Sequence, residues 1–278
     1  RIIEHFPTGG GGYIVATQTL GEKAGVVSGS ALLVDYVLTI TVSIAACGDA
    51  IFSFFPIGFQ PYKIPFEIAG IVLLIILNLR GTKESVTFLA PIFVVFVLTH
   101  ILMIGYGILS HVPDIGPLAQ RLHADYRAGL TTLGAGGMLL LFFRAFSLGG
   151  GTYTGIEAVS NGLQILREPR VQNGKKTMVY MAVSLAVTAG GILVCYLLLN
   201  VQPVLGKTLN AVLADRLFGG WAIGPVLAVV TIFSEGALLF VAAQTGFVDG
   251  PRVMANMAVD YWFPHRFASL SDRFTIQN

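Results

Sequence analysis

Charged residues are scarce in this sequence. Lys, Arg, Asp and Glu make up 12% of the 278 residues, about half the share that is typical of soluble domains. This low share, together with 54% hydrophobic residues, excludes an ordinary soluble globular protein and indicates an integral membrane protein. The formal net charge of only +2 does not suggest a nucleic-acid partner.

Cysteine is also rare. Cys47 and Cys195 both lie inside apolar runs, where small buried residues fit better than a disulfide. No cluster of His, Cys and Asp has zinc-ligand spacing, and the sequence offers no Ser-His-Asp arrangement. The Gly-Lys-Thr at Gly206–Thr208 lacks the first glycine of a P-loop. We therefore expect no enzyme, no bound metal and no cofactor.

Long apolar runs are what the sequence does contain. Six of them could cross the roughly 30 Å hydrocarbon core of a bilayer as helices. We expect these spans at Val26–Cys47, Phe66–Leu79, Phe88–Leu109, Leu130–Leu166, Met178–Val201 and Trp221–Val248. The fourth is too long for one straight helix, and Arg1–Gly25 is expected to be a polar, glycine-rich connection.

The chain is expected to form a single transmembrane domain over residues 1–278, as a fragment of a longer protein. Lys and Arg are distributed unequally between its connections, and cytoplasmic connections carry the excess. With both ends cytoplasmic, the inside segments hold eleven of these residues and the outside segments five. We therefore expect the Arg1 and Asn278 ends to be cytoplasmic.

Asp35 lies well inside the first span, and Thr39 and Ser43 follow at i+4 and i+8. In a helix these three side chains share one face. Their oxygens suit a dehydrated alkali cation or a protonated amine rather than a thiophilic metal. The alternative for the two hydroxyls is a polar seam between helices, whereas a membrane-embedded aspartate by default marks a pathway, a pair or a site.

The fourth span contains three consecutive glycines, Gly149–Gly151. Glycine adopts backbone conformations closed to other residues, so we expect the helix to unwind after Ser147 and to restart near Thr154. Carbonyls freed at the end of the first half can bind a cation. Discontinuous helices of this kind occur in secondary transporters built from inverted repeats; the alternative is a glycine-rich packing surface.

Further ionisable residues lie at membrane depth. Arg144 and Glu157 bracket the glycines; either they pair across the break, or Glu157 carries protons and Arg144 tunes it. We expect His100 to donate to a neighbouring backbone carbonyl. Glu235 shares a helix face with Thr231 at i−4, much as Asp35 does with its threonine, and this echo is what an internal repeat would leave.

Four stretches resemble the amino acid–polyamine–organocation (APC) superfamily of transporters. "FPTGGGGYIVATQTLGEKAGVVSGSALLVDYVLTITVSIAACGDAI" is similar to the region around the third helix of that family, and "NLRGTKES" to the loop after the fourth. "AFSLGGGTYTGIEAVSNG" resembles the sixth helix, with its TG-x-E-A pattern. "FVDGPRVMANMAVDYWFPHRFASLSDRF" resembles the end of the eighth helix and the loop that follows. The resemblance thus covers nearly the whole chain.

Within the superfamily, "LLVDYVLTITVSIAACGDAI" and "YTGIEAVSNG" are most similar to bacterial potassium importers of the Kim type. This resemblance implies an all-α membrane protein with a partial LeuT-like fold of inverted repeats, one helix being broken at the midplane. It also implies that the cation-site aspartate and threonine of helix 3 fall on Asp35 and Thr39, the helix-3 serine on Ser43 and the helix-6 threonine on Thr154.

We therefore expect a secondary active transporter in a bacterial cell membrane that carries K⁺ inward with protons. The expected cation site combines these residues with backbone carbonyls around the glycine break, at Ser147, Gly149, Gly150 and Gly151. Glu157 is the first candidate for proton coupling, and Glu235 is the second. The expected partners are the lipid bilayer and the transported ions, and a homodimer is compatible with the sequence.

Two alternatives remain open at this point. An amino acid or amine permease of the same superfamily would use Asp35 to bind a substrate amine. A channel or a structural membrane subunit would belong to another class, but a channel usually needs a filter motif, and the sequence has none. Saturable flux that requires a proton gradient would exclude the channel.

Overall fold

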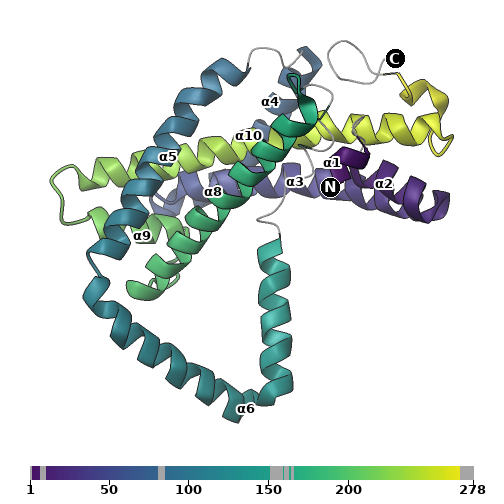
Figure 1. Cartoon of the computed structure of the whole chain (residues 1–278). Helices are drawn as coiled ribbons and strands as arrows, with labels where there is room; N and C mark the ends of the chain where they lie inside the picture. The colour runs from purple at the N-terminus through teal and green to yellow at the C-terminus, as the bar shows by residue number, and fades with distance from the viewer. Residues whose placement is uncertain are drawn as a thin grey trace.

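The computed structural model describes residues 2–6, 11–80, 85–150, 159, 163 and 166–269. These residues form helices and no β-strand, as predicted (Figure 1). The elements are α1 (Ile2–His5), α2 (Gly11–Leu20), α3 (Glu22–Phe52), η1 (Ile57–Tyr62), α4 (Lys63–Arg80), α5 (Ser85–Leu109), η2 (Val112–Asp114), α6 (Ile115–Gly149), α8 (Arg170–Leu198), α9 (Leu209–Phe218), α10 (Gly224–Val259) and η5 (His265–Phe267).

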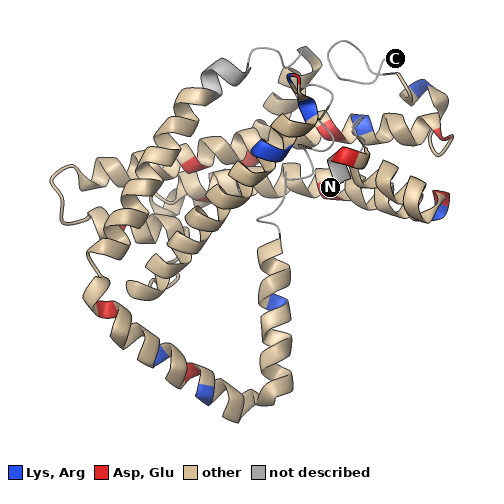
Figure 2. Cartoon of the chain, viewed as in Figure 1, with Lys and Arg blue, Asp and Glu red and all other residues tan. Residues whose placement is uncertain are grey.

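Six helices of the described part are long and apolar enough to cross a membrane. In the described part of the chain, the number of these candidate spans agrees with the six apolar runs of the sequence. Several helices extend beyond those runs: α3 continues from Cys47 to Phe52, and α10 continues from Val248 to Val259. α5 and most of α8 have no Lys, Arg, Asp or Glu, whereas the first limb of α6 carries several charged residues along its length (Figure 2).

The helices α3 and α10 lie side by side and run antiparallel (Figure 1). The Tyr36 carbonyl of α3 lies opposite Gly246 of α10, and the Cys47 carbonyl lies opposite Gly236. A Cβ atom on Gly246 would come within 2.8 Å of the Tyr36 carbonyl oxygen, so the two backbones approach closely at this point. Small residues that permit such an approach are typical of helix contacts in membranes.

The short helix α9 lies in the largest apolar cluster. Its own fully buried side chains are Ala211, Leu213, Ala214 and Phe218. The cluster also includes side chains from α3, α5, α8 and α10, namely Ala50, Met103, Cys195, Ala228 and Ile232. A helix of ten residues is marginal on its own in water, so docking on these four helices is what holds α9 in place.

The N-terminal connection contains a helix that the sequence did not predict. Tyr13 of α2 is buried against Val253 and Met257 of α10. Its hydroxyl donates to the Asp260 carboxylate at 2.6 Å. Burial and this hydrogen bond raise the pKa of Tyr13, so the phenol remains a donor at physiological pH and ties α2 to the end of α10.

The helix α6 bends sharply at Gly134, where φ is 68°, a value that glycine adopts readily and other residues rarely do. It begins at Ile115 instead of Leu130, because the polar residues before the apolar run are also helical. Figure 1 shows two limbs on either side of the bend, with the second limb standing apart from α3 and α10.

Candidate functional site

Asp35, Thr39 and Ser43 all lie in α3, whose regular helix places them on one face. Asp35 is exposed, and the two hydroxyl residues are half-buried. Their side chains make no hydrogen bond or ion pair with any residue that the structure describes. By contrast, the hydroxyls of Thr99 and Thr231 donate to carbonyls one turn earlier in their own helices. The three α3 side chains therefore keep their oxygens available to a ligand.

The end of α6 holds the other predicted site residues that can be placed. The helix ends at Gly149, and Gly150 follows with right-handed helical φ and ψ. Ser147 is exposed near this end. α6 makes its main contacts with η2 and α8, and the approach of this end to Asp35 stays a prediction. The remaining predicted residues lie outside the described part of the chain: Gly151, Thr154 and Glu157.

Glu235 of α10 belongs to a polar network inside the bundle. Its Oε1 accepts a hydrogen bond from Nδ2 of Asn210 on α9 at 2.8 Å. The Oδ1 of Asn210 in turn accepts from the hydroxyl of Tyr196 on α8. Glu235 Oε2 is buried and has no hydrogen-bond partner among the described residues. Thr231 lies one turn before Glu235 in α10, and its hydroxyl donates to the Leu227 carbonyl at 2.7 Å instead of to Glu235.

The surroundings of Glu235 favour the neutral carboxylic acid. An ionised side chain taken out of water without a partner charge costs several kcal/mol. A neutral hydroxyl without an acceptor costs only about 1–3 kcal/mol. Since no described ion pair includes Glu235, the protonated form has the lower free energy in this arrangement.

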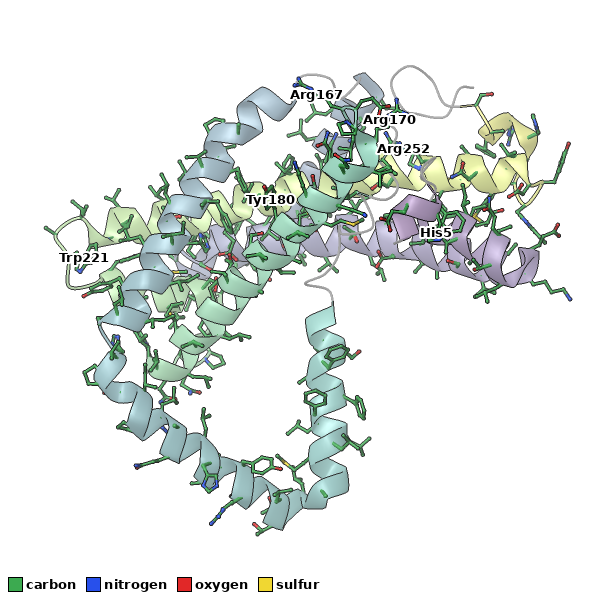
Figure 3. The ribbon with its side chains drawn as sticks, in the orientation of Figure 1. His5, Arg167, Arg170, Tyr180, Trp221 and Arg252 are labelled. Atoms are coloured by element: carbon green, nitrogen blue, oxygen red, sulfur yellow. The ribbon has the colours of Figure 1, made fainter. Side chains whose placement is uncertain are left out.

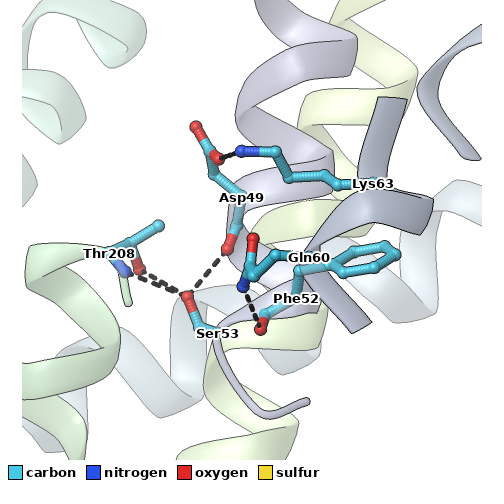
Figure 4. Close-up of polar contacts among 6 residues, drawn as sticks. All are labelled: Asp49, Phe52, Ser53, Gln60, Lys63 and Thr208. Atoms are coloured by element: carbon cyan, nitrogen blue, oxygen red, sulfur yellow. Dashed lines mark hydrogen bonds and ion pairs between the residues drawn. The ribbon is translucent and has the colours of Figure 1, made fainter. Parts of the chain in front are cut away.

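The start of α9 is also tied to α3 (Figure 4). Ser53 Oγ accepts from the backbone N–H of Thr208 at 3.0 Å and donates to the Asp49 carbonyl at 2.7 Å. The Asp49 carboxylate pairs with Lys63 at 2.6 Å. A cavity of about 500 Å³ lies beside these residues and extends to Lys207. Lys207 contacts Asp215 at 2.5 Å, so both Lys63 and Lys207 are paired with a carboxylate. The wall of the cavity therefore has little net charge.

Other buried polar groups join helices. His100 Nδ1 donates to the Phe96 carbonyl at 2.9 Å, which confirms the expected backbone contact. Asn78 of α4 and Gln244 of α10 exchange two amide hydrogen bonds, of 3.0 and 2.9 Å. Paired amides of this kind hold membrane helices together.

Three arginines lie near one another. Figure 3 shows Arg167, Arg170 and Arg252 near the start of α8, whereas Trp221 lies on the opposite side. The orientation of the ends in the membrane stays a prediction. Arg144 lies in the second limb of α6 and is exposed; its predicted relation to Glu157 involves a residue outside the described ones.

Comparison with known proteins gives the family. A family model for amino acid permeases matches residues 4–277. The chain belongs to this family of the APC superfamily. The amino acid permease match agrees with the resemblance drawn from the four sequence stretches.

A curated relative of this permease chain is "Potassium transporter KimA" from Bacillus subtilis (strain 168). The two are 36% identical over 278 residues, which is all of this chain and 44% of the relative. The chain thus spans less than half the length of the relative that it matches.

Sequence reasoning missed the partners of Glu235. A carboxylate inside an apolar run is conspicuous, but Asn210 and Tyr196 are ordinary residues in their local sequence. Only the docking of α9 between α8 and α10 brings them to Glu235. The N-cap of α9 is a local signal that was available, because the Thr208 hydroxyl accepts from the backbone N–H of Ala211 at 3.2 Å.

Proposed function

We propose that this permease-family protein carries K⁺ inward across a bacterial cell membrane, coupled to protons. The observation that carries the proposal is the row of oxygens on α3, formed by Asp35, Thr39 and Ser43, which have no described hydrogen-bond or ion-pair partner. One carboxylate with neutral oxygens can bind an alkali cation and still release it. The name of the Bacillus relative, a potassium transporter, supports potassium as that cation.

The rest of the proposed site comes from the segment at and after the end of α6. Thr154 and the carbonyls around Ser147–Gly151 would complete the coordination of the cation bound by Asp35 and Thr39. Glu157 is the first candidate to carry the coupled proton, and Glu235 is the second. These assignments rest on the sequence resemblance and on the chemistry of oxygen ligands.

Complementation of a bacterium that lacks potassium uptake tests the proposal. The intact protein is expected to restore growth at low K⁺, and Asp35→Asn is expected to abolish that growth. Asp49→Asn is the matched control, because this carboxylate lies in the same helix but is paired with Lys63. Unchanged uptake and apparent affinity in Asp35→Asn would show that the carboxylate does not bind the cation.

An amino acid or amine permease is the second candidate, and the family model favours it specifically. In that case Asp35 would bind the ammonium group of the substrate. Growth at low K⁺ would then not be restored. Liposomes that contain the purified protein would take up a labelled amino acid or amine, and Asp35→Asn would abolish this uptake.

A further inference from the structure

Glu235 is separate from the proposed cation site. A Cβ atom on its neighbour Gly236 would lie 3.6 Å from the Cys47 carbonyl oxygen of α3. Cys47 follows Asp35 by twelve residues and Ser43 by four, which is about 18 Å and about 6 Å along a helix. The Glu235 carboxyl therefore has a different environment and different partners from the oxygens of the α3 face.

The network fixes how Glu235 is hydrogen-bonded. Because the Tyr196 hydroxyl occupies Oδ1 of Asn210, the amide nitrogen of Asn210 is the atom that faces Glu235 Oε1. This amide supplies one donor to one carboxyl oxygen, and the other oxygen is buried without a described partner. A neutral acid fits one donor, whereas a carboxylate needs several donors or a cation.

Few charges surround this carboxyl. The titratable and charged side chains on the helices packed nearby include Cys47 and Asp49 on α3, Lys63 and Glu67 on α4, His100 and Tyr106 on α5, Cys195 and Tyr196 on α8, and Asp215 and Arg216 on α9. The cations among them have other partners: Lys63 pairs with Asp49, and Arg216 donates to the carbonyls of Leu199 and Asn200.

We propose that Glu235, Asn210 and Tyr196 form a proton-binding site, distinct from the cation site, at which a bound proton keeps α9 docked on α8 and α10. Loss of the proton would leave a buried carboxylate with a single donor, and release of α9 would admit water to it. The proposal gives the second proton-site candidate of the proposed function a specific role, and in that respect it rests on the proposed function.

Cys195 is a native reporter of this docking. Its side chain is fully buried in the apolar cluster that includes Leu217 of α9. In the intact protein with Cys47→Ala, the rate of alkylation of Cys195 by N-ethylmaleimide therefore measures how often α9 leaves its position. Glu235→Gln keeps an acceptor for Asn210 but cannot ionise. Dividing the alkylation rate of Cys195 in the protein with Glu235 by the rate in the Glu235→Gln variant therefore removes the pH dependence of the thiol itself.

The ratio of the unsubstituted to the Glu235→Gln rate is expected to rise about tenfold between about pH 6 and about pH 9, because deprotonation removes the stabilisation of the docked state. Tyr196→Phe should increase labelling at every pH, since it removes one hydrogen bond of the network. Asp215→Asn is the matched control: this α9 carboxylate is paired with Lys207, and the rise with pH should persist.

A ratio that stays constant with pH would overturn the proposal, as would a Cys195 that is not labelled at any pH. Labelling does not depend on the transported substrate. If Asp35→Asn abolishes potassium uptake while the ratio stays constant, only the Glu235 proposal fails. If the ratio rises while potassium is not transported, only the proposed substrate fails.

Discussion

Thr39 and Thr41 show how two identical residues on one helix differ in chemistry. They are two positions apart on α3 and therefore on roughly opposite faces. The Thr41 hydroxyl donates to the carbonyls of Val37 and Leu38 at 3.1 Å. The Thr39 hydroxyl makes no hydrogen bond with the described residues, so its oxygen is available on the same face as Asp35.

This difference predicts the effect of removing each hydroxyl. Thr39→Val is expected to raise the apparent KM for K⁺ about tenfold, which corresponds to about 1.4 kcal/mol of binding free energy. Thr41→Val removes only a contact with its own helix and should change KM by less than about twofold. Initial uptake rates over a range of K⁺ concentrations measure both; equal effects would contradict the role of Thr39.

At the same scale, sequence alone identified the unusual residues but not their environments. Asp35 and Glu235 were conspicuous because charges are costly within apolar runs. The sequence could not distinguish the exposed Asp35 from Glu235, whose Oε2 is buried. That distinction depends on α9, which is brought to Glu235 by tertiary packing.

At the scale of helices, close contact between α3 and α10 organises the bundle. A Cβ on Gly246 would lie 2.7 Å from Ile40 and 2.8 Å from the Tyr36 carbonyl oxygen. The carbonyl belongs to the backbone and cannot move aside without displacing α3. Gly190 of α8, in contrast, has open space around its Cβ position.

Gly246→Ala is therefore expected to destabilise the protein by about 1–3 kcal/mol through overpacking. Gly190→Ala should be neutral or stabilising by up to about 1 kcal/mol, because alanine has the higher helix propensity. Thermal unfolding of both variants in the same detergent measures the difference. Equal unfolding midpoints would show that the backbones are not in close contact at Gly246.

Helix existence was easier to predict than helix length. Hydropathy marks the part of a helix that crosses the bilayer, and this is why the ends at Phe52 and Val259 were missed. Helix α9 was not predicted because it is only ten residues long and its stability comes from docking. The bend at Gly134 was also missed, although Gly136 and Gly137 follow it closely in the sequence, because the prediction placed the only break of this span at the consecutive glycines Gly149–Gly151.

At the scale of the whole molecule, the distribution of basic residues predicts which side faces the cytoplasm. Lys176 lies at the start of α8, and Lys207 lies in the connection from α8 to α9. α8 is long and apolar enough to cross the membrane, so the two lysines belong to opposite sides.

In a background without Cys47 and Cys195, Lys207→Cys is expected to react with a membrane-impermeant maleimide in intact cells. Lys176→Cys should react only after permeabilisation, because basic connections remain cytoplasmic. The two variants serve as controls for each other. The reverse pattern of labelling would contradict the predicted orientation.

We propose that K⁺ enters together with protons through a site that contains Asp35. K⁺ influx into liposomes that contain the purified intact protein, under an imposed inward proton gradient, tests this most directly. We expect saturable influx that falls when a protonophore collapses the gradient and that Asp35→Asn abolishes. Influx that ignores the gradient, or that Asp35→Asn leaves unchanged, would contradict it.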